Sequence, residues 1–120
     1  MTSPGGEGKS VRRGEVYVAD LAPFGGQLFK NRPVLVVQND LGNQRSAETI
    51  VLTIRSDSGK RFAMLVPAAR GEGGLHRDSL IDAGHILTLP KSGLGRRVGA
   101  MPSGIMTAVN EALRVSLGLV

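Results

Sequence analysis

Alternating and continuous runs of apolar residues dominate the first half of the chain and predict β-strands. Residues 13–21 alternate apolar and polar positions, as a strand buried on one face does. Residues 33–37 are continuously apolar, which is typical of a strand buried on both faces. Residues 49–54 and 61–67 are rich in β-forming residues. We therefore expect four strands before residue 70.

The hydrophobic pattern changes toward the C-terminus. Three shorter strands are predicted at residues 79–81, 85–87 and 96–101. Apolar residues then recur at helical spacing from Ile105 to Leu117, with Ser103 as a predicted N-cap and Gly118 as the stop. This order of elements predicts an α+β, mainly β fold: a small, partly closed antiparallel barrel with a C-terminal helix.

Three segments lack strand or helix periodicity. Residues 1–12 are rich in Gly, Ser and Pro and predict a disordered lead-in, so the folded domain is expected to span residues 13–120. Residues 22–31 contain a proline and two adjacent glycines and predict a long loop. Residues 38–43 are predicted to be turn or capping residues.

Length and composition restrict the class of protein. A chain of 120 residues with 41% hydrophobic and 21% charged residues fits one globular domain. No apolar run approaches the roughly 20 residues of a membrane span, and the first 15 residues lack the apolar core of a signal peptide. The absence of cysteine excludes disulfides and thiolate chemistry. We expect a soluble cytoplasmic protein with no membrane partner.

The charge pattern favours an anionic partner. Fifteen Lys and Arg against ten Asp and Glu give a formal charge of +5, for which nucleic acid is the first partner to consider. Several cations flank the predicted strands: Arg12, Arg13, Lys30, Arg32, Arg55, Lys60 and Arg61. Strand ends gather at the rims of a barrel, so these cations either form one anion-binding cleft or remain separate solvated charges.

Arg32 has the most constrained position among these cations. It lies directly before Pro33, which biases it to extended backbone. Its guanidinium is therefore expected at the edge of a buried strand, where it can bind a phosphate in bidentate fashion. On the third predicted strand, Thr53 and Arg55 are two residues apart and share a face, which we expect to be polar.

The sequence offers little for metal or cofactor chemistry. His76 and His85 are its only histidines, and neither lies at metal-ligand spacing from another His, Asp or Glu. The glycines between residues 71 and 74 do not join a strand to a helix, as a nucleotide-binding loop does. We therefore expect no metal and no cofactor.

Two sequence blocks resemble the MazF/PemK family of toxin endoribonucleases. Residues 13–21 follow the pattern Arg-Gly-Glu-Val-Tyr-x-x-Asp-Leu, and residues 31–40 read Asn-Arg-Pro-Val-Leu-Val-Val-Gln-Asn-Asp. The resemblance continues through Asn43, residues 77–79 and residues 110–117. It implies a homodimer of SH3-like (CcdB/Kid-like) barrels that cuts single-stranded RNA (mRNA) without a metal. The ribose 2′-hydroxyl would attack and leave a 2′,3′-cyclic phosphate. A MazE-like antitoxin is the implied partner.

The resemblance assigns the catalytic arginine to Arg32, whose charge would stabilise the pentacoordinate phosphorus of the transition state. The family's second catalytic residue, a Thr or Ser, falls on Arg55, so the chain departs from the family at this position. We expect Arg55 to contact the phosphate and Thr53 or Ser56 to supply the missing hydroxyl.

RNA contacts are expected from seven further residues: Arg13, Phe24, Gln27, Phe29, Lys30, Arg77 and His85. The first loop contacts substrate in the family, and its two phenylalanines either stack on a base or pack on the barrel. His85 either reads a base edge or is structural, and Arg77 either binds RNA or pairs with Asp78 at a strand end. The alternatives for the whole chain are a gyrase-targeting toxin of the same fold and a non-catalytic relative.

Overall fold

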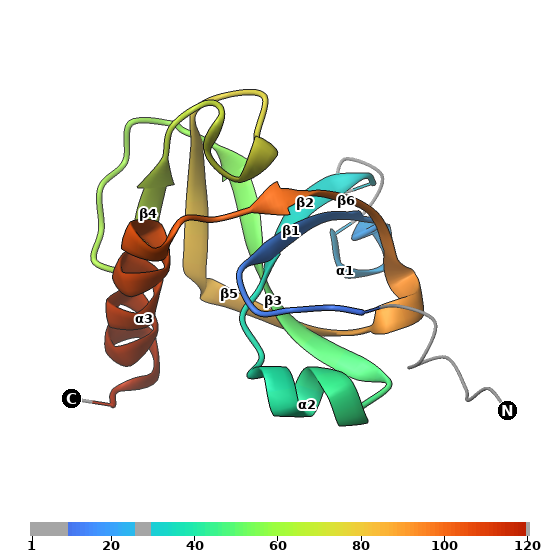
Figure 1. The fold of residues 1–120 in the computed structure, drawn as a ribbon. Helices are drawn as coiled ribbons and strands as arrows, with labels where there is room; N and C mark the ends of the chain where they lie inside the picture. The colour runs from blue at the N-terminus through green and yellow to red at the C-terminus, as the bar shows by residue number, and fades with distance from the viewer. Residues whose placement is uncertain (1–9, 26–29, 120) are drawn as a thin grey trace, which may run out of the picture.

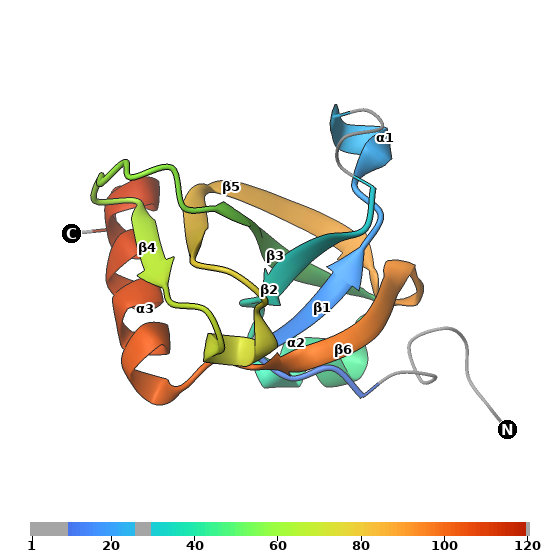
Figure 2. The ribbon, with the colours of Figure 1, turned by 90° about the horizontal axis from the view of Figure 1, so that it is seen from above.

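The computed structural model of the chain describes residues 10–25 and 30–119. Within them, antiparallel strands form one sheet in the order β4-β5-β3-β2-β1-β6. The strands are β1 (Glu15–Ala19), β2 (Arg32–Val36), β3 (Glu48–Ser56), β4 (Leu65–Ala68), β5 (Ser79–Pro90) and β6 (Leu94–Ala100). The sheet curls, and helix α3 (Ser103–Leu117) packs against β4 and β5 (Figures 1 and 2). The α+β, mainly β fold with a C-terminal helix is thus confirmed.

Both faces of the central strands are buried. On β3, Leu52 and Ile54 pack in a cluster with Val109 and Ala112 of α3, whereas Val51 packs in a second cluster with Tyr17 and other residues of the curled sheet. Alternate residues of a strand point to opposite faces, so each face of β3 contributes to a different core. The face expected to be polar carries Thr53 and Arg55, but Thr53 is buried and only Arg55, near the end of the strand, is exposed.

Some predicted strand boundaries were wrong. The strands expected at 79–81 and 85–87 are parts of one strand, β5, which continues through the residues between them by way of a bulge. There the pairing of β3 with β5 shifts from Leu52↔Ile86 to Thr53↔Asp82. The fourth strand begins at Leu65 rather than at residue 61, and the last one begins at Leu94.

Short helices replace two of the predicted loops or turns. Helix α1 (Ala22–Gly25) lies in the first loop, and α2 (Asp40–Arg45) begins where Asn39 accepts a hydrogen bond from the backbone N–H of Gly42 at 2.8 Å. The N-cap of α3 is Pro102, so the capping role expected of Ser103 was wrong. Gly118, with φ of 69°, ends α3 as predicted. Two 3-10 turns, η3 (Glu72–Gly74) and η4 (Lys91–Gly93), flank β5.

Residues 10–12, expected in the lead-in, belong to the folded domain. Val11 is buried in the cluster that contains Tyr17, and the backbone N–H of Arg12 donates to Glu15 Oε1 at 2.8 Å. The rest of the expected lead-in, residues 1–9, lies outside the described residues. Over the described ranges, every helix is too short or too polar to span a bilayer.

Candidate active site

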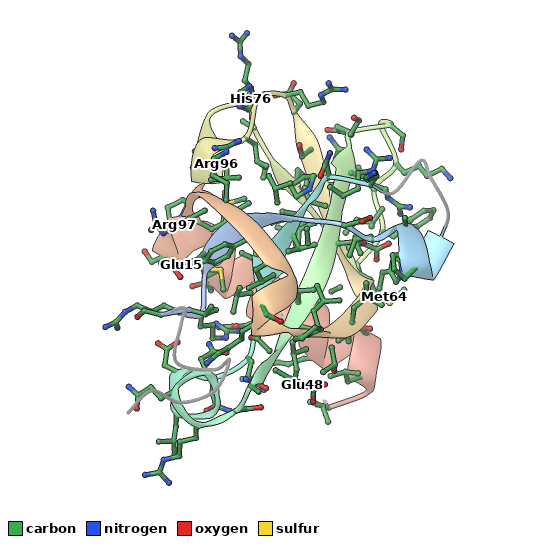
Figure 3. The ribbon with its side chains drawn as sticks, turned by 90° about the vertical axis from the view of Figure 1, so that its right-hand side faces the viewer. Glu15, Glu48, Met64, His76, Arg96 and Arg97 are labelled. Carbon is green, nitrogen blue, oxygen red and sulfur yellow. The ribbon has the colours of Figure 1, made fainter. Side chains whose placement is uncertain are left out.

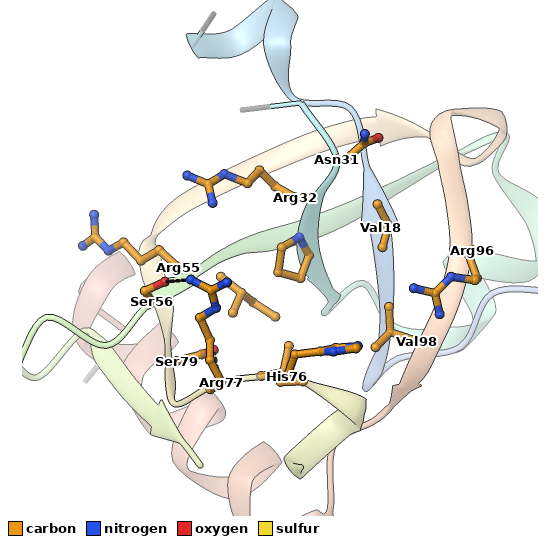
Figure 4. A pocket seen from close by; sticks show the side chains of 13 residues that line it. Val18, Asn31, Arg32, Arg55, Ser56, His76, Arg77, Ser79, Arg96 and Val98 are labelled. Atoms are coloured by element: carbon orange, nitrogen blue, oxygen red, sulfur yellow. Dashed lines mark hydrogen bonds between the residues drawn. The ribbon is translucent and has the colours of Figure 1, made fainter. Parts of the chain in front are cut away.

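A cleft of about 270 Å³ opens where the ends of several strands meet (Figure 4). Its apolar lining consists of Val18, Pro33, Ile54, Leu75 and Val98. Its charged and titratable lining consists of Arg32, Arg55, His76, Arg77 and Arg96, with the hydroxyl of Ser56 among them. The residues that the structure places in the lining include no Asp or Glu, so the cleft is strongly electropositive.

The backbone around Arg32 fixes the start of β2. Asn31 has φ of 57°, a left-handed conformation that Asn tolerates better than most residues, and Pro33 follows Arg32. Arg32 is half-buried and pairs with Ala19 of β1. The sequence placed Arg32 at the edge of a cleft, and the structure puts it in the cleft lining.

Strand register brings a second arginine to the same place. Val34 of β2 pairs with Thr53 of β3, and continuing this register by two residues places Arg32 opposite Arg55. Like charges that face each other on neighbouring strands are destabilising, and a bound anion relieves the repulsion. Arg55 is restrained by Asp82, whose Oδ2 lies 3.1 Å from its Nη2. The guanidinium of Arg55 is therefore held at the cleft while half of its side chain remains exposed.

The two candidate hydroxyl groups occupy different environments. Arg77 Nη1 donates to Ser56 Oγ at 3.3 Å, and both residues line the cleft (Figure 4). Thr53 is buried, and its Oγ1 lies 3.1 Å from His85 Nδ1, across the bulge of β5. Neither Thr53 nor His85 is among the lining residues. The geometry therefore favours Ser56 over Thr53 as the source of the hydroxyl and does not support the RNA contact expected of His85.

The cations that flank the predicted strands do not all meet in one cleft, so neither of the two arrangements considered from the sequence describes all of them. Among the seven cations that flank predicted strands, all of them described, only Arg32 and Arg55 line the cleft. Arg13 instead donates to the carbonyl of Val37 at 2.8 Å and to Asn110 Oδ1 at 2.7 Å, so it links the residue after β2 to α3, and its expected RNA contact stays a prediction. Arg61 is paired with Asp57 at 2.9 Å.

The expected contacts of the first loop remain predictions. Lys30 is exposed and is not a lining residue. Phe24 lies in α1, but its side chain is not described, and Gln27 and Phe29 lie outside the described residues.

Two residues of the cleft were missed from the sequence as functional candidates. Arg96 lines the cleft from β6, and His76 lines it from the segment after η3 (Figures 3 and 4). Arg96 and Val98 are two residues apart and therefore share a face of β6. Only the pairing of β6 with β1 shows that this face borders the cleft. His76 follows a Gly-rich segment without periodicity, so no local pattern indicates its position.

A buried carboxylate fixes β6 against β1. Glu15 Oε2 accepts from Arg97 Nε at 2.8 Å, and Figure 3 labels these two residues. Glu15 Oε1 accepts from Tyr17 Oη at 2.9 Å. Burial by itself raises the pKa of Glu15, but the hydrogen bonds from Arg97, the Arg12 backbone and Tyr17 outweigh it, so the pKa is lowered. Burial and the Glu15 carboxylate raise the pKa of Tyr17 to about 12. This network stabilises the strand that presents Arg96.

Comparisons with known proteins find a matching family model and similar curated proteins. Residues 12–117 match the family model described as PemK-like, MazF-like toxin of type II toxin-antitoxin system. Endoribonuclease EndoA of Bacillus subtilis (strain 168) is 38% identical over 112 residues, which cover 92% of this chain and 97% of that protein. Endoribonuclease MazF of Staphylococcus saprophyticus is 37% identical over 111 residues, covering 91% of this chain and 92% of that protein.

Solved structures agree with the sequence comparisons. An endoribonuclease from a mycobacterial species, in complex with its cognate antitoxin, superposes with a TM-score of 0.79 at 26% identity, covering 92% of this chain and 97% of that one. MazF from Deinococcus radiodurans has the same fold, with a TM-score of 0.75 at 19% identity, covering 92% of this chain and 98% of that one.

Proposed function

The chain belongs to the family of PemK-like, MazF-like toxins of type II toxin–antitoxin systems, and we propose that it is an endoribonuclease that cleaves single-stranded RNA in the cleft around Arg32. The observation that carries this proposal is the convergence of Arg32 and Arg55 from neighbouring strands on a cleft without a lining carboxylate among the described residues. A phosphodiester is the anionic group of RNA that such a pair of guanidinium groups binds best.

The proposed reaction is a transesterification within the RNA. Arg32 and Arg55 bind the non-bridging oxygens and stabilise the charge that develops on the pentacoordinate phosphorus. Ser56 Oγ, which accepts a hydrogen bond from Arg77, orients the ribose 2′-hydroxyl for attack. The products are a 2′,3′-cyclic phosphate and a 5′-hydroxyl. Because the nucleophile belongs to the RNA, the reaction needs no metal-activated water.

Cleavage of a defined RNA in the presence of EDTA tests the proposal. Mass spectrometry should find fragments that end in a cyclic phosphate, and Arg32→Ala should lower the rate about 10²–10³-fold, as loss of a transition-state donor does. Arg45→Ala is the matched control, because Arg45 is exposed on α2 and does not line the cleft. RNA that stays intact across varied sequences would refute the proposal. Inhibition of gyrase without RNA cleavage would support the gyrase-targeting alternative instead.

We also propose that the chain is a cytoplasmic homodimer neutralised by a MazE-like antitoxin. The support for the antitoxin is the mycobacterial relative described as in complex with its cognate antitoxin. Val115 and Leu117 of α3 are about half exposed, and exposed apolar residues on a helix favour a protein interface. Light scattering of the purified protein should give twice the 12.6 kDa mass of one chain. A monomer at micromolar concentration would contradict the dimer.

A further inference from the structure

The cleft is rich in groups that bind phosphate but poor in groups that transfer protons. Arginine remains protonated at neutral pH, and serine and asparagine do not titrate in this range. The described lining includes no Asp, Glu, Lys or Tyr. His76 is therefore the one described lining residue whose side-chain type exchanges protons near neutral pH.

The backbone before His76 is closely packed. Leu75 is buried in the core, its carbonyl accepts from the Gly71 N–H at 2.8 Å, and its N–H donates to the Glu72 carbonyl at 3.0 Å. The backbone of Gly73 packs against Gly99 of β6. The imidazole of His76 is exposed, but packing and hydrogen bonds fix the backbone that positions it. A group that transfers a proton must be held in position in this way.

His76 and Ser56 lie in different parts of the cleft lining. In Figure 4 the Ser56–Arg77 pair lies at one end of the cleft and Arg96 at the other, and His76 lies between them, apart from Ser56. In a displacement at phosphorus, the attacking and leaving oxygens are roughly in line on opposite sides of the phosphorus atom. Groups that serve these two oxygens must therefore stand on opposite sides of the bound phosphate, and Ser56 and His76, which are separated in the cleft lining, can form such a pair.

We propose that His76 is a catalytic residue, the general acid that protonates the leaving oxygen; this inference rests on the proposed function. As the bond between O2′ and phosphorus forms and the bond between phosphorus and O5′ breaks, a ring N–H of the imidazolium passes its proton to O5′. The proton of the 2′-hydroxyl passes to solvent water. The neutral imidazole then takes up a proton from solvent before the next turnover, so the protein is unchanged.

Substrates with two different leaving groups test this role. The first is an RNA that the wild-type protein cuts, and the second has sulfur in place of O5′ at the cleaved bond. A thiolate is a far more stable leaving group than an alkoxide and departs without a proton. His76→Ala and His76→Gln should cut the oxygen substrate about 10²–10⁴-fold more slowly than wild type. Both variants should cut the sulfur substrate at close to the wild-type rate.

The controls separate this proposal from the proposed function. Arg32→Ala should be slow on both substrates, because the phosphate still requires charge stabilisation, and Arg45→Ala should match wild type on both. Equal slowing of both His76 variants on both substrates would overturn the general-acid role and assign His76 to binding or folding. Wild-type rates for these variants on the oxygen substrate would overturn it as well. Failure of the wild-type protein to cut either substrate would instead refute the endoribonuclease function.

Discussion

Replacing Gly99 with alanine tests whether the cleft depends on the close approach of β6 to η3. A Cβ at Gly99 would lie 2.5 Å from the Gly73 carbonyl oxygen, 2.7 Å from the Gly73 carbonyl carbon and 3.1 Å from the Gly74 nitrogen. Ordinary van der Waals contact begins near 3.4 Å, so the two segments must separate by about 0.9 Å. All three neighbouring atoms are backbone, so no flexible side chain can yield.

The size of the effect follows from this displacement. Forcing an extra methyl group into a packed site costs about 1–3 kcal/mol, and we expect about 2 kcal/mol for Gly99→Ala because the backbone must move. The displaced segment continues into Leu75 and His76, which line the cleft. A misplacement of about 1 Å in a catalytic site can lower the rate about 100-fold. The variant should therefore fold, with reduced stability, and cleave RNA up to about 100-fold more slowly.

Urea denaturation and initial cleavage rates measure the two effects of Gly99→Ala separately. Gly104→Ala is the matched control, because a Cβ at this position of α3 meets no atom within 4 Å. That control should gain about 0.4–1 kcal/mol of stability and keep its cleavage rate. An unchanged denaturation midpoint for Gly99→Ala would show that η3 moves away from β6 without loss of stability. A lower midpoint with an unchanged cleavage rate would refute the link between η3 and the cleft.

Other predictions concern individual contacts. Asp82→Asn removes the ion pair with Arg55. Thermal denaturation should show a change of no more than about 1 kcal/mol in the free energy of unfolding, because Arg55 is 54% exposed. The cleavage rate should fall up to about tenfold. Tyr17 is the only tyrosine, and its ultraviolet absorbance should titrate near pH 12 rather than near 10. Because its folded pKa is raised, Tyr17 contributes stability that is present below pH 10 and is lost as the pH rises toward 12. Glu15→Gln should lower the urea midpoint at pH 7. The folded pKa of Glu15 is lowered, so the stability that its carboxylate contributes is present above about pH 4.5 and is lost as the pH falls. The urea midpoints of Glu15→Gln and of the wild-type protein should therefore converge in acid.

Local sequence patterns predicted the elements of the fold better than the composition of the cleft. The continuous apolar run of β2 and the helical spacing of α3 depend on neighbouring residues, and both elements formed where expected. The position of Arg32 was also predictable, because Pro33 constrains its backbone directly. In contrast, the approach of Arg55 to Arg32 depends on the register between β2 and β3, which the sequence does not encode locally.

The bulge in β5 explains why the sequence left the choice between Thr53 and Ser56 open. A regular pairing of β3 with β5 would continue from Leu52↔Ile86, but the shift places Asp82 opposite Thr53 and leaves His85 beside the threonine hydroxyl. Thr53 is therefore buried against β5 and is outside the cleft lining. The glycine next to His85 indicated a break but not its kind, because glycine occurs both in turns and in bulges.

The geometry of β3 bears on the proposed mechanism, because position 55 holds an arginine and not a hydroxyl residue. Ile54 and Ser56 share a face of the strand, and Ile54 contributes to the apolar lining, so a hydroxyl at position 56 points toward the same side. Arg55 is on the other face, but it lies at the strand end, and its long side chain still reaches the cleft lining. Asp82 balances the added charge. Under the proposed mechanism, moving the hydroxyl by one residue leaves position 55 for a second guanidinium opposite Arg32, and a Ser56→Ala variant that cleaves RNA at the wild-type rate would refute this reasoning.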